Sequence, residues 1–206
     1  MGLKTFVKVG EISNLSDARY CAGMGVDLLG FNVNSESPYY VTPETFKDLS
    51  GWVAGVKFVG ECSGMNADDI KLATQDYGFD YLQVDEIDQL TELADLGVEL
   101  IYRLNVSDDA TLQNLQNLVE SAVEECEMIV ISTDNPDYYS AIADVVSEVY
   151  ENVKILKGFD ITETNISSTI SEGHFVGIEL KGSEEEQPGF KDYGDLMDIL
   201  EALDEY

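Results

Sequence analysis

Several carboxylates of this chain stand directly after short apolar runs, where parallel strands place their working residues. Four of them are Glu11, Asp85, Glu86 and Asp134. Carboxylates that converge in one cleft act as acids and bases or bind a divalent cation. Because the chain has 41 acidic residues, some of them reach such places by chance. The pattern therefore leaves three interpretations open: an acid–base pair, a cation site at Asp85 and Glu86, or a solvated acidic rim.

Two lysines occupy similar places nearer the C-terminus. Lys157 lies towards the end of one apolar run, and Lys181 follows the next run. Lysine binds phosphate as a point charge. Alternatively, both lysines are solvated and balance the glutamates at 184–186, a run that would itself repel an anion. The charges alone do not decide between these interpretations.

Apolar runs alternate with helix-like segments along the whole chain. The predicted strands are 5–9, 27–33, 55–60, 79–84, 98–106, 128–133, 153–159 and 175–180. Short continuous apolar runs are typical of parallel strands that are buried on both faces. The sequence predicts one α/β domain over residues 1–206, a single (β/α)8 barrel. A doubly wound open sheet is less favoured, because no Gly-x-Gly-x-x-Gly follows the first strand. The weakest predicted helix is 163–171, which is rich in Ser, Thr and Ile.

The net charge of −30 limits the partners of this protein. Nucleic acid and anionic membranes would be repelled, so we expect neither as a partner. No apolar run approaches the roughly 20 residues of a membrane span. The three cysteines lack the spacing of a disulfide framework or a zinc site, and no motif indicates a cofactor. We expect a cytoplasmic protein, monomeric or homodimeric, with a small-molecule ligand.

Five stretches of the chain form a recognisable pattern. Residues 8–18 read Lys-Val-Gly-Glu-Ile-Ser-Asn-Leu-Ser-Asp-Ala, and residues 25–31 read Gly-Val-Asp-Leu-Leu-Gly-Phe. Residues 37–44 read Ser-Pro-Tyr-Tyr-Val-Thr-Pro-Glu, 81–84 read Tyr-Leu-Gln-Val, and 188–192 read Pro-Gly-Phe-Lys-Asp. In order and spacing they resemble motifs of the phosphoribosylanthranilate isomerase family, among them Lys-Ile-Cys-Gly-Ile-Thr, Ser-Pro-Arg-Tyr-Val-Ser-Pro-Glu and Pro-Gly-x-Lys-Asp. That family is a (β/α)8 barrel of tryptophan biosynthesis.

The resemblance implies an Amadori rearrangement of a phosphoribosylated anthranilate, with a cysteine on the first strand as general base and an aspartate on the sixth as general acid. This chain has Gly10 and Ser132 at those places. Glycine has no group to accept a proton, and a serine hydroxyl is a poor acid without activation. Each loss removes on the order of 10²–10⁴-fold in rate. We therefore predict lost or altered isomerase activity, and whether the chain is an enzyme stays open.

Glu11 and Asp134 stand one and two positions beyond the missing groups, so they are the candidate catalytic substitutes. The resemblance further implies a ligand site at the C-terminal face of the barrel, in part for phosphate, formed by Gln83, Lys157, Gly158, Lys181, Gly182 and Ser183. Three functions follow: an isomerase-like barrel that acts on or binds a sugar-phosphate-type ligand, a non-catalytic barrel that binds a metabolite or protein, and a carboxylate- or cation-dependent isomerase or lyase.

Overall fold

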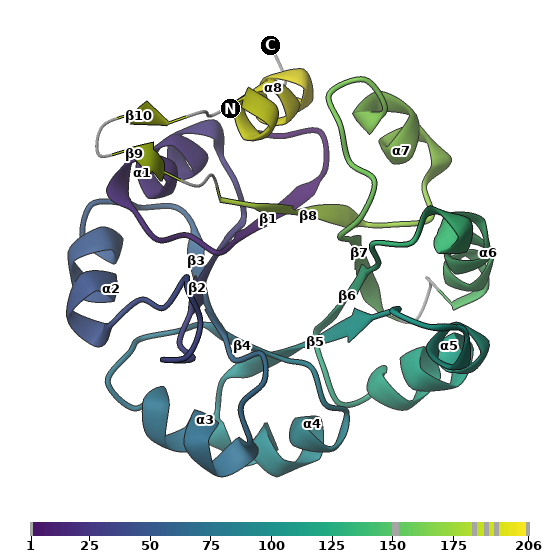
Figure 1. The fold of residues 1–206 in the computed structure, drawn as a ribbon, viewed down its shortest axis with the longest axis horizontal. Coiled ribbons are helices and arrows are strands. Elements are labelled where there is room, and N and C mark those ends of the chain that lie inside the picture. Colours follow the sequence, from purple (N-terminus) through teal and green to yellow (C-terminus); the bar gives the residue numbers. More distant parts are fainter. Residues whose placement is uncertain (1, 150–152, 183–184, 188–189, 192–193, 205–206) are drawn as a thin grey trace.

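The computed structural model describes residues 2–149, 153–182, 185–187, 190–191 and 194–204. Within them, parallel strands β1 to β8 close into a barrel in chain order, and helices α1 to α8 surround it (Figure 1). The predicted (β/α)8 barrel is confirmed. None of the described helices has both the length and the apolar character of a membrane span.

The barrel strands are short. They are β1 (Phe6–Gly10), β2 (Leu28–Asn32), β3 (Lys57–Glu61), β4 (Tyr81–Val84), β5 (Glu99–Asn105), β6 (Met128–Ser132), β7 (Lys154–Lys157) and β8 (Gly177–Lys181). Several begin later than predicted. Asp27 and Asp80 were expected inside strands, but their carboxylates accept hydrogen bonds from the backbone N–H groups of Val7 and Phe58, at 2.8 Å each. Asp27 and Asp80 therefore lie just before the paired residues of their own strands, β2 and β4. Their side chains hold the first residues of the neighbouring strands β1 and β3 by hydrogen bonds.

The helices alternate with the strands as expected. They are α1 (Leu15–Met24), α2 (Pro43–Ser50), α3 (Ala67–Ala73), α4 (Asp88–Leu93), α5 (Asp109–Ala122), α6 (Tyr139–Val149), α7 (Ile166–Glu172) and α8 (Gly194–Leu203). The N-cap side chains of Asn14, Thr42, Asn66 and Asp108 each accept a backbone N–H of the first turn. Helix α7 begins later than predicted, because 162–165 forms a hydrogen-bonded turn of its own.

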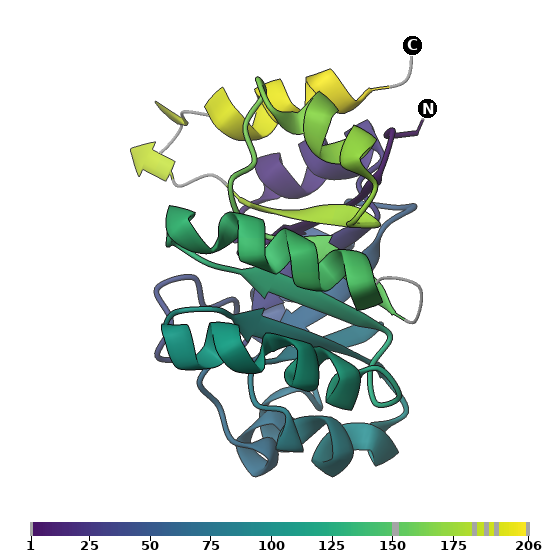
Figure 2. The same cartoon turned by 90° about the vertical axis from the view of Figure 1, so that its right-hand side faces the viewer.

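Smaller elements complete the fold. The 3-10 turns η1 (Ala94–Leu96) and η2 (Pro136–Tyr138) border α4 and α6, and β9 (Glu185–Gln187) pairs with β10 (Phe190–Lys191). Figure 2 shows this hairpin at one end of the barrel and the chain ends at the other, where Leu3 and Asp204 form an isolated bridge. The strands run towards the hairpin end, so that end carries the loops in which barrel enzymes place their sites.

The apolar core has two parts. The larger one lies between the strands and the surrounding helices. The smaller, which we call the inner cluster, lies inside the barrel and consists of Leu28, Val59, Tyr81, Ile101, Met128, Val130 and Leu156, with Phe6 packed against it. Its members come mostly from the first halves of the strands. Two residues further along, the strands carry mostly polar side chains, with glycine at 30 and 158, and these polar side chains form the candidate site.

Candidate functional site at the C-terminal ends of the strands

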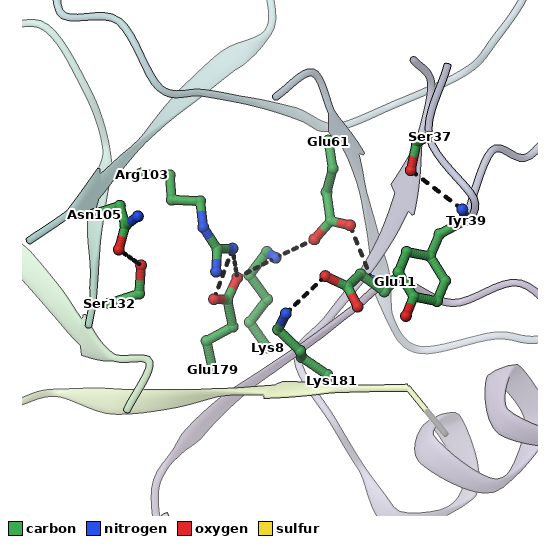
Figure 3. A network of polar contacts seen from close by, with 10 residues as sticks. All are labelled: Lys8, Glu11, Ser37, Tyr39, Glu61, Arg103, Asn105, Ser132, Glu179 and Lys181. Atoms are coloured by element: carbon green, nitrogen blue, oxygen red, sulfur yellow. Dashed lines mark hydrogen bonds and ion pairs between the residues drawn. The ribbon is translucent and has the colours of Figure 1, made fainter. Parts of the chain in front are cut away.

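Four charged side chains meet inside the barrel. Lys8 of β1 is completely buried, and its Nζ donates to Oε1 of Glu61 and to Oε1 of Glu179, at 2.6 Å each. Nη1 of Arg103 lies 2.9 Å from Oε2 of the same Glu179. Figure 3 shows the four side chains, from β1, β3, β5 and β8, reaching across the barrel towards one another. We call this set the ion-pair network; it balances two positive against two negative charges.

The network keeps Lys8 and Glu179 charged at neutral pH. Burial lowers the pKa of Lys8, but the carboxylates of Glu179 and Glu61 outweigh that effect and raise the pKa above 10.5. Burial raises the pKa of Glu179, yet the positive charges of Lys8 and Arg103 hold that pKa below 4.5. Buried charges are tolerated only when they are paired and hydrogen-bonded. These side chains meet that condition.

Glu61 fills the space beside Gly10, where the resemblance implies the general base. A Cβ on residue 10 would lie 2.5 Å from Oε1 of Glu61, and a Cβ on Gly30 would lie 2.3 Å from the same atom. Oε2 of Glu61 accepts the backbone N–H of Glu11 at 2.9 Å, and Glu11 has the left-handed φ of 56°. The carboxylate therefore occupies the room of a thiol at position 10, and both its oxygens are already bonded.

Glu11, a predicted catalytic substitute, lies at the rim of the barrel. Its Oε1 pairs with Nζ of Lys181 at 3.0 Å, and both side chains are partly exposed (Figure 3). The other substitute, Asp134, follows β6 and lines a cavity of about 590 Å³. Lys181 lines the same cavity. The structure thus brings both predicted carboxylates to the C-terminal face of the barrel.

The cavity extends over the C-terminal ends of β4 to β8. Its charged and hydroxyl-bearing lining includes Asp85, Glu86, Arg103, Ser132, Asp134 and Lys181. Ser132 stands where the resemblance implies the general acid, and its Oγ lies 3.5 Å from Oδ1 of Asn105. This hydroxyl has no strong base beside it among the hydrogen bonds of the described residues. The Ser132 hydroxyl is therefore not activated as an acid.

The two lysines predicted to flank a phosphate do not lie together. Alternate residues of a strand face opposite sides, and Leu156 takes the inward place in β7. Lys157 therefore points out of the barrel, where its Nζ lies 3.4 Å from the carbonyl of Asp160 and 5.0 Å from the ring centre of Phe159. Burial lowers its pKa. Only Lys181 of this pair lines the cavity.

The glycines of the predicted phosphate site already use their backbone N–H groups. Gly158 donates to the carbonyl of Ile131, and Gly182 donates to the carbonyl of Gly10, at 2.8 Å each. Ser183 lies outside the described residues. The amides at 158 and 182 therefore continue the barrel's own hydrogen bonding and are not free to hold a phosphate.

Gln83 of β4 and Asp85, which directly follows β4, carry oxygen atoms without hydrogen-bond partners among the described residues. Gln83 is only 1% exposed, and its Oε1 has no hydrogen-bond partner. Oδ2 of Asp85 accepts the N–H of Gly64 at 3.1 Å, whereas the buried Oδ1 of Asp85 has none. Asp85 and Glu86 were the candidate metal ligands. Among the described residues, however, no group of three or more His, Cys, Asp or Glu side chains is arranged to hold a metal ion.

The ion-pair network as a unit was missed by sequence reasoning. Lys8 enters the sequence analysis only as the first residue of the motif at 8–18, Glu61 directly follows a predicted strand, and Arg103 and Glu179 lie inside predicted strands. A usable signal was present: each is a charge inside an apolar strand, and the four charges sum to zero. Gly10 and Gly30, next to an inward carboxylate, would have strengthened that signal.

Comparisons with known proteins agree on one kind of barrel. No family model matches the chain. It is 26% identical over 202 residues to the N-(5'-phosphoribosyl)anthranilate isomerase of Rubrobacter xylanophilus, with 93% of this chain and 94% of that protein covered. The phosphoribosyl anthranilate isomerase structure from Thermotoga maritima has a TM-score of 0.75 at 19% identity, with coverage of 97% and 98%. A phosphoribosyl anthranilate isomerase in complex with reduced 1-(o-carboxyphenylamino)-1-deoxyribulose 5-phosphate has a TM-score of 0.74, also at 19% identity and with the same coverage.

Proposed function

We propose that this chain, a relative of the phosphoribosylanthranilate isomerase family as its motifs predicted, binds a small polar molecule at the C-terminal face of the barrel and does not carry out the family's rearrangement by the family's acid–base pair. The carboxylate of Glu61 beside Gly10 is the observation that carries this proposal. It fills the room of the missing base and is itself bonded to Lys8 and to the backbone of Glu11.

Proton transfer requires a group with a free lone pair or a free proton within reach of the substrate. Glu61 accepts hydrogen bonds from Lys8 and Glu11 and is only 4% exposed, so the lone pairs that these bonds leave free are out of reach of a substrate. On the acid side, Ser132 would have to give up a hydroxyl proton with no strong base beside it among its described contacts. Neither the general base nor the general acid that the resemblance implies therefore has a working substitute at its own position, residue 10 or residue 132. This supports a lost or altered activity.

The family relation favours a sugar-phosphate-type ligand. One structural relative holds a deoxyribulose 5-phosphate derivative, and Arg103 and Lys181 bring positive charge to the cavity of this chain. Against that ligand, the amides of Gly158 and Gly182 are already bonded, and Lys157 points away from the cavity. A cytoplasmic location, the absence of nucleic-acid partners and a monomeric or homodimeric state stay predictions.

A second candidate function is an isomerase that uses Glu11 and Asp134 in place of the lost groups. It is favoured by one observation: Asp134 lines the cavity, and Glu11 contacts Lys181, which lines it too. In this function the two carboxylates would exchange protons with a substrate that spans the cavity.

One assay separates the two functions. Phosphoribosylanthranilate is formed chemically from ribose 5-phosphate and anthranilate, and its disappearance is followed with the purified wild-type chain. We expect no rate above the uncatalysed background. Turnover that Glu11→Gln or Asp134→Asn abolishes would overturn the proposal and establish the second function. A thermal-shift titration with the reduced substrate analogue, run in parallel, reports binding without chemistry, because a ligand at 100 times its Kd stabilises by about 2.7 kcal/mol.

A further inference from the structure

Arg103 belongs both to the ion-pair network and to the lining of the cavity, and only one of its nitrogens is bonded. Nη1 donates to both carboxylate oxygens of Glu179, at 3.1 Å to Oε1 and 2.9 Å to Oε2. Nη2 and Nε, which carry the other three N–H donors of the guanidinium, bond to no described residue, and the dashed lines in Figure 3 reach neither of them. Neither nitrogen is sealed in the interior, because neither is among the buried side-chain atoms without a partner. Since Arg103 lines the cavity, this free edge of the guanidinium is open to it.

The free edge is held in a fixed position from below. Glu179 is only 5% exposed and is itself held by Lys8, whose Nζ donates to it at 2.6 Å. In a planar guanidinium Nε–H and one N–H of Nη2 are parallel, and this pair of donors matches the two oxygens of a carboxylate. A donor pair that is already oriented loses little conformational freedom when a ligand binds. The network therefore presents a preformed site for a flat, two-oxygen acceptor.

Two uncharged polar side chains lie next to the free edge. Arg103 and Asn105 are two apart on β5, on the inward face that begins with Ile101 of the inner cluster. Asn105 pairs in register with Ser132 of β6, and both residues line the cavity. Nδ2 of Asn105 donates to no described residue, and the Ser132 hydroxyl makes only the long contact of 3.5 Å with Oδ1 of Asn105. Figure 3 shows both side chains on the side of Arg103 that faces away from Lys8, so an acceptor at the free edge has further donors beside it.

We propose that the free edge of Arg103 binds the carboxylate of a small organic molecule, with Asn105 and Ser132 as additional donors. The ligand supplies two acceptor oxygens to donors that have no described partner, and Glu179 keeps the guanidinium in place beneath it. At about 590 Å³ the cavity has the usual size of a small-molecule site, so it has room for the rest of such a ligand. This inference rests on the proposed binding function and names the chemical group by which the ligand is held.

A phosphate is a poorer occupant of this edge than a carboxylate. Asp85, Glu86 and Asp134 also line the cavity and form no ion pair with any described residue. Coulomb repulsion grows with the charge of the ligand, so these carboxylates oppose a phosphate dianion about twice as strongly as a single carboxylate. A carboxylate is also planar, as the donor pair is. The lining therefore favours a singly charged, flat anion.

The test reads the Arg103 side chain directly, because the chain has only one other arginine, the exposed Arg19. The full chain, labelled with nitrogen-15, is titrated with benzoate in about 0.3 M potassium chloride, which screens the acidic surface. The two Nε–H resonances are followed by NMR, and Arg19→Lys assigns them. We expect a saturable shift of the Arg103 resonance and none of the Arg19 resonance. Benzamide, the neutral counterpart of the same shape, should shift neither, and inorganic phosphate should bind more weakly than benzoate.

Substitutions then separate the donor pair from its charge. Arg103→Lys keeps a positive charge beside Glu179 but removes the parallel donors, so the Kd for benzoate, measured by calorimetry, should rise about tenfold or more. Asn105→Ala removes one neighbouring donor and should raise the Kd by less. Arg19→Lys is the matched control and should leave the Kd unchanged.

Four outcomes would each overturn the inference: no saturable shift of the Arg103 resonance, an equal response to benzamide, phosphate binding as tight as that of benzoate, or an unchanged Kd in Arg103→Lys. The first three are read on the wild-type side chain, so they stand even if Arg103→Lys fails to fold. If ribose 5-phosphate binds in the cavity while the Arg103 resonance stays in place with benzoate, the inference fails and the proposed binding function stands. Turnover in the isomerase assay fails the proposed function alone.

Discussion

The two halves of the barrel interior are built from the same strands but are held together by different interactions. In β3, β4 and β5 the inward residues of the first half are Val59, Tyr81 and Ile101, which belong to the inner cluster. Two residues further along, the inward residues are Glu61, Gln83 and Arg103. One half is held by apolar packing without directional requirements, and the other by hydrogen bonds and charge. The change of a strand's inward residue from apolar to polar marks where apolar packing ends and the candidate site begins.

The comparison also concerns stability. Burial of an apolar side chain is favourable by itself, whereas a buried ion pair is weak evidence for stability because its desolvation offsets its attraction. The ion-pair network therefore adds little net stability for its size, but it penalises the loss of any single member. Substitutions in the inner cluster should therefore lower the free energy of unfolding in proportion to the apolar surface removed. Loss of one charge of the network should lower it by a large step.

The largest expected effect follows removal of the charge at the centre of the network. Lys8→Met keeps the length of the side chain and leaves the buried carboxylates of Glu61 and Glu179 facing each other. Removing one partner of a buried pair costs about 3–5 kcal/mol. We expect a loss of that order in the free energy of unfolding, measured by urea denaturation.

Lys154→Met is the matched control. It breaks the pair of Lys154 with Glu127, whose side chains are 55% and 39% exposed. Exposed pairs contribute about 0–1 kcal/mol, so this variant should remain close to the wild type. If Lys8→Met were equally mild, the network would be no more than a set of incidental contacts, and the contrast between the two halves would disappear.

The fold could be predicted from sequence, whereas the pairing of the charges within the network could not, for a physical reason. Alternation of apolar runs with capped helices is a local pattern, and a closed barrel is its usual outcome. Lys8 and Glu179 are 171 positions apart and become neighbours only because β8 closes onto β1. Lys157 illustrates the limit at single-residue scale, since a shift of one position along a strand reverses the side that a residue faces. Strand ends identified the C-terminal face correctly, but not which side chains point into it.

A smaller effect is expected at residue 10, where the resemblance implies a catalytic cysteine and where Glu61 fills the space beside the glycine. Gly10→Cys places a Cβ 2.5 Å from Oε1 of Glu61, and overpacking of this kind costs about 1–3 kcal/mol. Glu61→Val removes the clash but leaves Lys8 with one fewer partner. In the double variant the cysteine has room, so we expect the two substitutions to couple favourably in a double-mutant cycle of unfolding free energies.

Gly23→Ala serves as the glycine control for that cycle. Nothing lies within 4 Å of a Cβ at residue 23, which is in α1, and alanine in a helix is favoured over glycine by about 1 kcal/mol. This variant should be neutral or slightly more stable. Additive losses for Gly10→Cys and Glu61→Val would mean that Glu61 does not occupy the room of the missing thiol. Adding Ser132→Asp to the double variant then tests whether the isomerase chemistry can be restored.

The smallest expected effect concerns the slope of the unfolding free energy against pH, which should differ between the two halves. The pKa of Glu179 is lowered from 4.5 in the folded chain, although burial alone would raise it, because Lys8 and Arg103 stabilise the carboxylate. As the pH falls from 4.5 through that lowered value, the unfolded chain binds more protons than the folded one, so this part of the stability is lost. Glu179→Gln should make the fall in unfolding free energy on acidification shallower.

Ile101→Val of the inner cluster should behave in the opposite way. It removes one buried methylene, which costs about 0.5–1.5 kcal/mol, and it changes no titrating group. The curve of unfolding free energy against pH should therefore move down as a whole with its slope unchanged. A parallel shift for Glu179→Gln as well would show that the buried carboxylate is not held ionised by its neighbours. The polar half would then differ from the apolar half in composition but not in the pH dependence of its contribution to stability.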